Sequence, residues 1–518
     1  MFSHIRIAVA TACIIAVGSA IASASQTVRY SALPFHAHPL TVFRHTPPRP
    51  PIPTHRVTLA DELRAQAGGW QPVQASPPFG ANGAGSELLM TDGSVMVQDN
   101  TSNWYRLVPD QNGSYIKGTW QQAASLGNNY GPLYFASAVL ADGKLMIDGG
   151  EYNFFNPAET NKGAIYDPVA NTWTSVSPPP WPEVGDASSV VLADGTMMIG
   201  NCCNSVQALF NESALSWTTT GTGKFDSNSE EGWTLLADGK VLTADVFGEP
   251  NSELYNPRNG SWSAAGQLPS DLTQAFEIGP QVLRPNGTVF VAGGSQHTAI
   301  YQTHRHTWVA GPDFPIVGGQ QLDMTDGPAT LLTNGDVLMA ASPGVYQAPM
   351  TMLIFNGKTF TQVANPPDAP NDSSYNVRLL MLPTGQVLET DGTDDVEVYT
   401  PRGRAIPATV PVITAVNSTL THGNTYSISG TLFNGVSQAN AYGDDDQQAT
   451  NYPIVRITNS TTNHVFYART HGHSYMGVAS SQTVSTNFDV PTSIELGASQ
   501  IQVIANGVAS LPVAIYIN

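Results

Sequence analysis

Acidic and tyrosine side chains stand at one recurring position of this sequence, about nine residues before a glycine turn. Read back nine positions from each glycine, the residues are Ala84, Tyr134, Asp186, Glu230, Ile278, Asp326 and Asn376, and Glu277 and Tyr375 stand one position earlier. Glu277 is the alternative to Ile278 in its unit. Carboxylates that gather in one place raise one another's pKa unless a cation or hydrogen-bond donors neutralise them. If the units surround an axis, the pattern therefore indicates a metal site or a site for a polyhydroxylated ligand. The alternative is that these acids cap loops or face water.

Two further stretches could do chemistry in the last quarter of the chain. His471 and His473 are two residues apart, so on a strand they would point to one face and could share a metal. Partnered surface histidines are the more common outcome of such a pair. Residues 443–447 read Gly-Asp-Asp-Asp-Gln, which is typical of a solvated acidic turn. Calcium binding is the other interpretation, although the spacing is not that of an EF-hand.

The elements that must position these residues are seven copies of a hairpin. Apolar runs flank a turn that ends in Gly93, Gly143, Gly195, Gly239, Gly287, Gly335 or Gly385. The spacings between these glycines are 50, 52, 44, 48, 48 and 50 residues. Apolar residues around an Asp-Gly or Asn-Gly pair predict a two-stranded β-hairpin.

A second mark follows four of the hairpins, an aromatic residue seven positions before a tryptophan. The pairs are Tyr166/Trp173, Phe210/Trp217, Tyr255/Trp262 and Tyr301/Trp308. Each unit thus supplies four strands in about 50 residues, the pattern of a kelch propeller blade. The seventh unit lacks its outer strand, and residues 69–73 offer one. We therefore predict an all-β fold with a seven-bladed propeller over residues 68–403, closed so that no sheet edge stays open.

The flanking segments differ from the blades. Residues 1–24 have the pattern of a signal peptide, and residues 25–67 form a Pro/His-rich leader with a short helix over 58–66. Residues 404–518 alternate over about seven strands, as in an immunoglobulin-like sandwich. The mature chain keeps two adjacent cysteines, Cys202 and Cys203. They either form a vicinal disulfide or are two small buried residues, and the second interpretation is the simpler one.

Composition excludes several classes of protein. The 518 residues carry a net charge of −19, with 21 Lys+Arg against 40 Asp+Glu. This argues against a nucleic-acid binder, which needs a basic surface. No apolar run after the signal peptide is long enough to span a membrane. We expect a secreted protein, and a monomer.

The order of signal peptide, kelch propeller and C-terminal sandwich with a Thr470-His471 strand resembles the galactose oxidase/glyoxal oxidase family. The resemblance covers roughly residues 68–518. It implies a C-terminal loop that brings a histidine into the propeller pore. It also implies a copper ion held by two tyrosines and two histidines, with a cysteine cross-linked to one tyrosine. Such a site oxidises an alcohol or aldehyde and reduces oxygen to hydrogen peroxide.

The resemblance carries over only in part when it is followed residue by residue. The Tyr-His pair of the last blade corresponds to Tyr375 and Asn376, so the tyrosine is kept and the histidine is lost. The cross-linked tyrosine falls at Glu230, with Trp233 nearby, and its cysteine partner falls at Asp186. The C-terminal histidine corresponds to His471, with His473 as the alternative.

The resemblance therefore implies a site without the thioether pair. Asp186, Glu230 and Tyr375 would be the catalytic groups, and Glu230, Tyr375, His471 and His473 the metal ligands. The ligand-binding residues would be Tyr134, Glu277, Asp326, Asn376 and Trp233. Oxygen-rich ligands suit Ca²⁺ or Mn²⁺ better than copper.

We expect a galactose-oxidase-like protein that binds or processes a carbohydrate-like ligand without copper-radical chemistry. The alternatives are a working copper oxidase, hence an oxidoreductase, with a diverged ligand set, and a structural or adhesion propeller.

Overall fold

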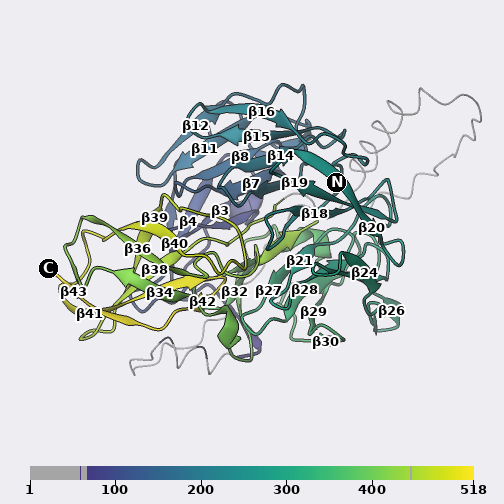
Figure 1. Ribbon diagram of the computed structural model, residues 1–518. Coiled ribbons are helices and arrows are strands. Elements are labelled where there is room, and N and C mark those ends of the chain that lie inside the picture. The colour runs from purple at the N-terminus through teal and green to yellow at the C-terminus, as the bar shows by residue number, and fades with distance from the viewer. Residues whose placement is uncertain (1–58, 60–62, 64–66, 444–445) are drawn as a thin grey trace, which may run out of the picture.

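The computed structural model describes residue 59, residue 63 and residues 67–443 and 446–518 (Figure 1). The predicted signal peptide, the leader up to residue 58 and most of the short helix lie outside the described residues. Residues 59 and 63 are helical. In the rest of the described part the regular secondary structure consists of strands and three short 3-10 turns, η2 (Gly80–Asn82), η3 (Ser374–Asn376) and η4 (Pro407–Thr409). The prediction of an all-β fold is confirmed. No helix among these residues is long and apolar enough to cross a membrane.

Each predicted glycine turn joins the two inner strands of one blade. The pairs are β2 (Glu87–Leu89) with β3 (Val95–Gln98), β7 (Ala136–Val139) with β8 (Leu145–Asp148), β13 (Ser189–Val191) with β14 (Met197–Gly200), β17 (Thr234–Leu235) with β18 (Val241–Ala244), β21 (Gln281–Leu283) with β22 (Thr288–Ala292), β27 (Pro328–Leu331) with β28 (Val337–Ala341), and β31 (Arg378–Met381) with β32 (Val387–Thr390). The seven turn glycines have φ between 77° and 94°. This left-handed conformation explains why glycine recurs there.

The outer strands complete the blades. They are β4 (Trp104–Val108) and β5 (Thr119–Gln122), β11 (Gly163–Asp167) and β12 (Thr172–Val176), β15 (Gln207–Asn211) and β16 (Ser216–Thr220), β19 (Asn251–Asn256) and β20 (Ser261–Gln267), β23 (Thr298–Gln302) and β24 (Thr307–Ala310), β29 (Thr351–Phe355) and β30 (Phe360–Gln362), and β33 (Val396–Thr400). The four predicted aromatic–tryptophan pairs lie directly opposite each other on the third and fourth strands. Their ring centroids are 4.9–5.3 Å apart. These ring pairs pack the outer part of blades two to five.

The last blade takes its outer strand from the N-terminal side, as the sequence predicts. Strand β1 (Gly69–Pro72) pairs with β33, and Trp70 lies opposite Tyr399 with the ring centroids 5.0 Å apart. The ring is therefore closed by a strand that is more than 300 residues away in sequence. Short additional strands lie in the loops: β6 (Pro132–Leu133), β9 (Tyr152–Asn153), β10 (Asn156–Pro157), β25 (Ile316–Val317) and β26 (Gln320–Gln321).

The C-terminal unit begins at β34 (Val412–Val416), after η4. Its other strands are β35 (Thr419–Leu420), β36 (Thr425–Thr431), β38 (Ile454–Asn459), β39 (Val465–His471), β40 (Val484–Asp489), β41 (Gly497–Ala505), β42 (Val508–Ala509) and β43 (Val513–Ile517). Strand β39 pairs with β38 through its first half and with β40 through its last three residues. The strand thus passes from one group of strands to the other, and a common apolar core that includes Phe488 and Ile501 lies between them.

The C-terminal unit lies against the face of the propeller that carries the glycine turns, which we call the turn face. Backbone N–H groups of Thr470, His473 and Met476 donate to carbonyls in the hairpins of blades one, two and three, at 3.2, 3.0 and 2.9 Å. The opposite face carries the residues that precede each inner strand, and we call it the mouth face.

One segment of the C-terminal unit enters the propeller, and we call residues 433–452 the finger. Its strand β37 (Asn440–Tyr442) adds to the inner strand β27 of blade six, with Asn440 opposite Thr330 and Tyr442 opposite Pro328. The segment therefore lies inside the ring, where the side chain of Gln438 also accepts a hydrogen bond from the backbone N–H of Leu235 in blade four at 2.7 Å. The resemblance implies a C-terminal loop in the pore, but one that carries a histidine; residues 433–452 contain no histidine, and the sequence did not predict the strand β37.

Candidate functional site

Three of the predicted acids converge at the mouth face. Glu230, Glu277 and Asp326 precede the inner strands of blades four, five and six, and one carboxylate oxygen of each lies within 4.8 Å of the others. Their exposed fractions are 8%, 3% and 1%. Ile278, the strict counterpart of Glu277 in the nine-residue spacing, is buried in the apolar core. In blade five Glu277, and not Ile278, thus lies with the other two acids, and we call Glu230, Glu277 and Asp326 the mouth acids.

The backbone at this position is unusual. Tyr134, Glu230 and Asp326 occupy the same place in three blades and have φ of 52°, 60° and 53°. Phe276, next to Glu277, has φ of 69°. A residue other than glycine costs conformational free energy when its φ is positive. Such residues cluster at functional sites, where the surrounding fold holds the backbone in place.

Tyrosines adjoin the mouth acids. The hydroxyl of Tyr346 donates a short hydrogen bond to Glu277 Oε1. Its ring meets that of Tyr375 edge to face, with the centroids 4.9 Å apart. The sequence predicted Tyr375 but missed Tyr346, because Tyr346 lies in the loop between β28 and β29 rather than at the repeated position.

The tip of the finger closes the channel beside these residues. A Cβ on Gly443 would lie 2.7 Å from Asp326 Oδ1, so only glycine fits there. Asp446 is fully buried, and its carboxylate accepts hydrogen bonds from Ser86 Oγ at 2.8 Å and from Arg378 Nε at 2.5 Å. Asp446 is therefore not part of a solvated turn, and the other two aspartates of the acidic run, at 444 and 445, lie outside the described residues.

Arg378 organises the other side of the mouth. Its guanidinium lies over the ring of Tyr442, 3.8 Å from the centroid, and 5.4 Å from that of Tyr134. It also donates to the carbonyl oxygen of Tyr375 at 2.9 Å. Burial raises the pKa of Glu87 well above its usual range, and the Arg378 charge opposes this rise. The arginine thus joins the finger, the predicted tyrosines and a buried acid of blade one.

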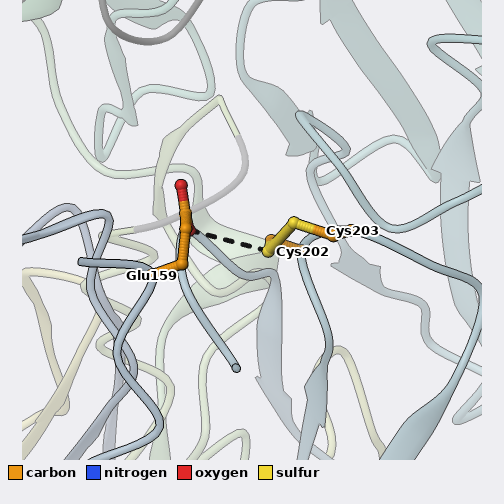
Figure 2. A group of neighbouring side chains, drawn as sticks. All are labelled: Glu159, Cys202 and Cys203. Atoms are coloured by element: carbon orange, nitrogen blue, oxygen red, sulfur yellow. Dashed lines mark hydrogen bonds between the residues drawn. A yellow bond between two sulfur atoms is a disulfide. The ribbon is translucent and has the colours of Figure 1, made fainter. Parts of the chain in front are cut away.

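Asp186 lies at the mouth end of blade three, next to a disulfide. Cys202 and Cys203 are bonded to each other, and Cys202 Sγ lies 3.6 Å from Glu159 Oε2 (Figure 2). The backbone N–H of Cys202 donates to Val184 O at 2.9 Å. The interpretation of two unbonded cysteines is wrong, and the alternative of a vicinal disulfide holds. Strand β14 returns the chain to the mouth face, so the disulfide lies at that face.

The two histidines do not reach this site. Strand β39 ends at His471, and Gly472 has φ of 64°, so the alternation that would align His473 with it is broken. His471 Nε2 lies 3.1 Å from Asp489 Oδ1, and His473 Nδ1 lies 2.8 Å from Thr486 Oγ1. Both rings belong to the C-terminal unit at the turn face. The expectation that either one shares a metal with Glu230 and Tyr375 is wrong.

Two predicted ligand-binding residues have other surroundings. Trp233 packs against Trp262 among the apolar side chains of the core, and it is not among the residues gathered at the mouth. Asn376 lies in η3, between Tyr375 and blade seven, outside the group of mouth acids.

The donor atoms decide which metals fit. The described residues form three groups of at least three His, Cys, Asp or Glu side chains, and none of these groups contains a histidine. Copper in proteins is held by imidazole and sulfur ligands, whereas three carboxylates suit Ca²⁺ or Mn²⁺. The residues at the mouth therefore do not fit the copper site that the resemblance implies.

No protein-family model matches the chain. A curated kelch-like protein, terF of Aspergillus terreus (strain NIH 2624 / FGSC A1156), is 25% identical to it over 326 residues. The predicted kelch-type resemblance is confirmed. The alignment covers 57% of this chain and 64% of the kelch-like relative, so it spans less than two thirds of that protein.

Solved structures give weaker matches. A copper-bound fungal alcohol oxidase of the AA5 family aligns with 87% of this chain and 99% of its own, at 14% identity and a TM-score of 0.48. A virginiamycin B lyase from Staphylococcus aureus aligns with 61% of this chain and 94% of its own, at 8% identity and a TM-score of 0.45.

Proposed function

We propose that this kelch-type protein is secreted and binds a polyhydroxylated, carbohydrate-like ligand at its mouth face, without copper-radical chemistry. The observation that carries the proposal is the convergence of Glu230, Glu277 and Asp326 with Tyr346. Carboxylates accept hydrogen bonds from hydroxyl groups, and charged acceptors make the stronger bonds. Several acceptors in a small area suit a ligand that offers several hydroxyl donors.

Exposed aromatic rings next to the mouth acids support this proposal. Phe276 is 41% exposed and stacks on Phe247, with the ring centroids 5.4 Å apart. Phe225 is 72% exposed, and its ring lies beside Gly248, where an added Cβ would be 3.1 Å away. Ligand sites typically combine apolar aromatic surface with a few placed polar groups. We call these three phenylalanines the aromatic shelf, which would contact the C–H face of a sugar ring.

The absence of copper-radical chemistry is proposed from the residues themselves. The resemblance puts Glu230 and Asp186 at the places of the cross-linked tyrosine and its cysteine. A carboxylate cannot form a thioether, and the only described cysteines are bonded to each other. The described residues then offer no thioether-linked tyrosine to take up the second electron of an alcohol oxidation.

A glycan array tests the binding proposal. We expect the wild type to bind a limited set of glycans. Glu277→Gln should bind the same glycans about 10- to 100-fold more weakly, as expected for a lost hydrogen bond to a charged group. Phe276→Ala should also weaken binding. Glu212→Gln, on the turn-face loop between β15 and β16, is the control and should bind like the wild type.

The array also has outcomes that contradict the proposal. No binding to any glycan would contradict it. So would equal binding by the wild type and Glu277→Gln, because the mouth acids would then not be in contact with the ligand.

A further inference from the structure

A second group of acids lies behind the mouth, inside blade four. Asp226 and Glu231 belong to the segment that leads into β17, and Asp245 follows β18. One carboxylate oxygen from each of the three lies within 4.8 Å of the others. Their exposed fractions are 5%, 0% and 2%. We call these three residues the inner acids; the mouth acids are a separate group.

A lysine satisfies only one side of this group. Lys224 Nζ lies 2.8 Å from Glu231 Oε1 and 2.7 Å from Glu253 Oε2. The other oxygen of Glu253 accepts from the backbone N–H of Phe225 at 2.8 Å. Two carboxylates therefore share one ammonium group. With Asp226 and Asp245 included, four carboxylates face one lysine, which leaves a formal charge of −3 when all of them are ionised.

The other side of the group has oxygen atoms without donors. Both carboxylate oxygens of Asp245 and the Oε2 of Glu231 are buried, and no hydrogen bond from the described residues reaches them. Asp226 Oδ2, by contrast, accepts from the backbone N–H groups of Val246 and Phe247 at 2.8 and 2.9 Å. Backbone N–H groups thus hold Asp226 in place, and its carboxylate lies close to the carboxylates of Glu231 and Asp245. Buried acceptors of this kind cost free energy unless something compensates them.

We propose that Asp226, Glu231 and Asp245 bind one hard divalent cation, with Ca²⁺ the best fit. All of the ligand atoms are oxygens, and Ca²⁺ accepts six to eight oxygens in variable geometry, including bidentate carboxylates. Mg²⁺ fits less well, because it keeps several waters in a strict octahedron and this site is closed to solvent. Zinc and copper favour nitrogen and sulfur ligands.

Protonation alone does not account for the arrangement. Burial raises the pKa of Asp245 to about 7 and that of Glu231 well above its usual range. A protonated carboxyl still requires an acceptor for its O–H, and its second oxygen still lacks a donor. A cation satisfies the oxygens of all three residues at once.

The site would also position the mouth. Glu231 directly follows Glu230, whose backbone has φ of 60°, and Glu231 O accepts a short hydrogen bond from Ser188 of blade three. An ion on Glu231 would thus hold the segment that presents Glu230 at the mouth. This inference does not depend on the proposed glycan binding.

The test uses the full chain after treatment with a chelator and desalting. Calcium titrated by calorimetry should bind with one equivalent, and the melting temperature should rise with calcium concentration, because a ligand of the native state alone stabilises it. Asp245→Asn and Glu231→Gln should bind calcium at least about tenfold more weakly, since each removes a charged ligand. Both variants should fold without calcium, because each relieves repulsion between like charges.

Two variants serve as controls. Asp148 is fully buried with neither oxygen bonded, but it stands outside the acid groups, so Asp148→Asn should respond to calcium like the wild type. The melting temperature of Glu230→Gln should also rise with calcium, because Glu230 belongs to the mouth acids and not to the inner acids.

Any of three results would overturn the inference. The first is a wild type whose melting temperature is unchanged by Ca²⁺, Mg²⁺ and Mn²⁺. The second is an Asp245→Asn variant that binds calcium as the wild type does. The third is loss of calcium binding in Glu230→Gln but in neither Asp245→Asn nor Glu231→Gln. The glycan array, run at constant calcium, reports on the mouth separately.

Discussion

The finger should be held in the propeller by the ion pair between Asp446 and Arg378, and breaking this pair should destabilise the whole protein. The exposed fractions of the two side chains are 0% and 9%. Asp446→Asn removes the negative charge at nearly constant shape and leaves the guanidinium uncompensated. Arg378→Met removes the positive charge and leaves the aspartate beside Glu87, a second fully buried acid.

The expected size follows from the burial. Removing one partner of a buried ion pair costs about 3–5 kcal/mol, because the other charge remains without compensation. Arg378→Met should stand at the upper end, since it also removes the guanidinium from the ring of Tyr442. The double variant should cost less than the sum of the two single variants, because no lone charge is left behind. As a control, Lys240→Met breaks a surface pair with Asp238 and should cost at most about 1 kcal/mol.

Urea unfolding of the four variants and the wild type measures these differences. Tryptophan fluorescence and circular dichroism should give coincident transitions before the midpoints are converted to free energies. The reasoning fails if either single variant at the buried pair unfolds within about 0.5 kcal/mol of the wild type, which is the range of ordinary surface substitutions. It also fails if the single costs simply add in the double variant.

Two further predictions concern ring closure and pH. A chain that starts at residue 58 should have the same melting temperature as one that starts at residue 25. A chain that starts at residue 76 lacks β1, so its free energy of unfolding should fall by about 3 kcal/mol or more, the cost of removing a packed tryptophan. Equal melting temperatures of all three chains would contradict the closure by Trp70. Burial lowers the pKa of His473 to about 3, so below its ordinary pKa of about 6.5 the unfolded chain takes up a proton that the folded chain does not. His473 therefore does not lower the free energy of unfolding above pH 6.5, and it lowers this free energy progressively as the pH falls from 6.5 towards 3. The urea midpoint of His473→Asn should therefore fall less steeply between pH 6.5 and pH 4 than that of the wild type, and parallel profiles would contradict this.

The sequence predicted the parts of the fold that repeat. The glycine turns require a positive φ, and the aromatic–tryptophan pairs lie opposite each other on neighbouring strands, so both leave a mark at each period. The convergence of Glu230, Glu277 and Asp326 followed from that period alone. The sequence left the choice between Glu277 and Ile278 open. The hairpin of blade five is as long as the others, with Leu283 paired to Val289 as Val191 is paired to Met197, so the offset of one residue arises before β21, where no periodicity encodes it.

The parts that do not repeat were not predicted. The finger holds one strand, β37, which has three residues and pairs with a strand about 110 residues away in sequence. A strand of this length is too short to show an alternation pattern. Its acidic tip resembled a solvated turn because the contact of Asp446 with Arg378 is a product of the tertiary fold. His471 was placed at the mouth by resemblance to another family, and Gly472 with the hairpin of blade two keeps it at the turn face instead. Tyr346 and the aromatic shelf lie in loops whose positions no periodicity encodes.

Oxygen consumption by the copper-loaded protein tests the central proposal most directly, because a mouth built of carboxylates and tyrosines cannot support the copper-radical reaction. The full chain would be incubated with copper, desalted, and supplied with galactose, glyoxal or a simple primary alcohol in an oxygen electrode with a peroxide-coupled dye. We predict no oxygen uptake and no hydrogen peroxide above the protein-free control for any of these substrates. Sustained oxygen uptake with matching peroxide release from any one of them would contradict the proposal.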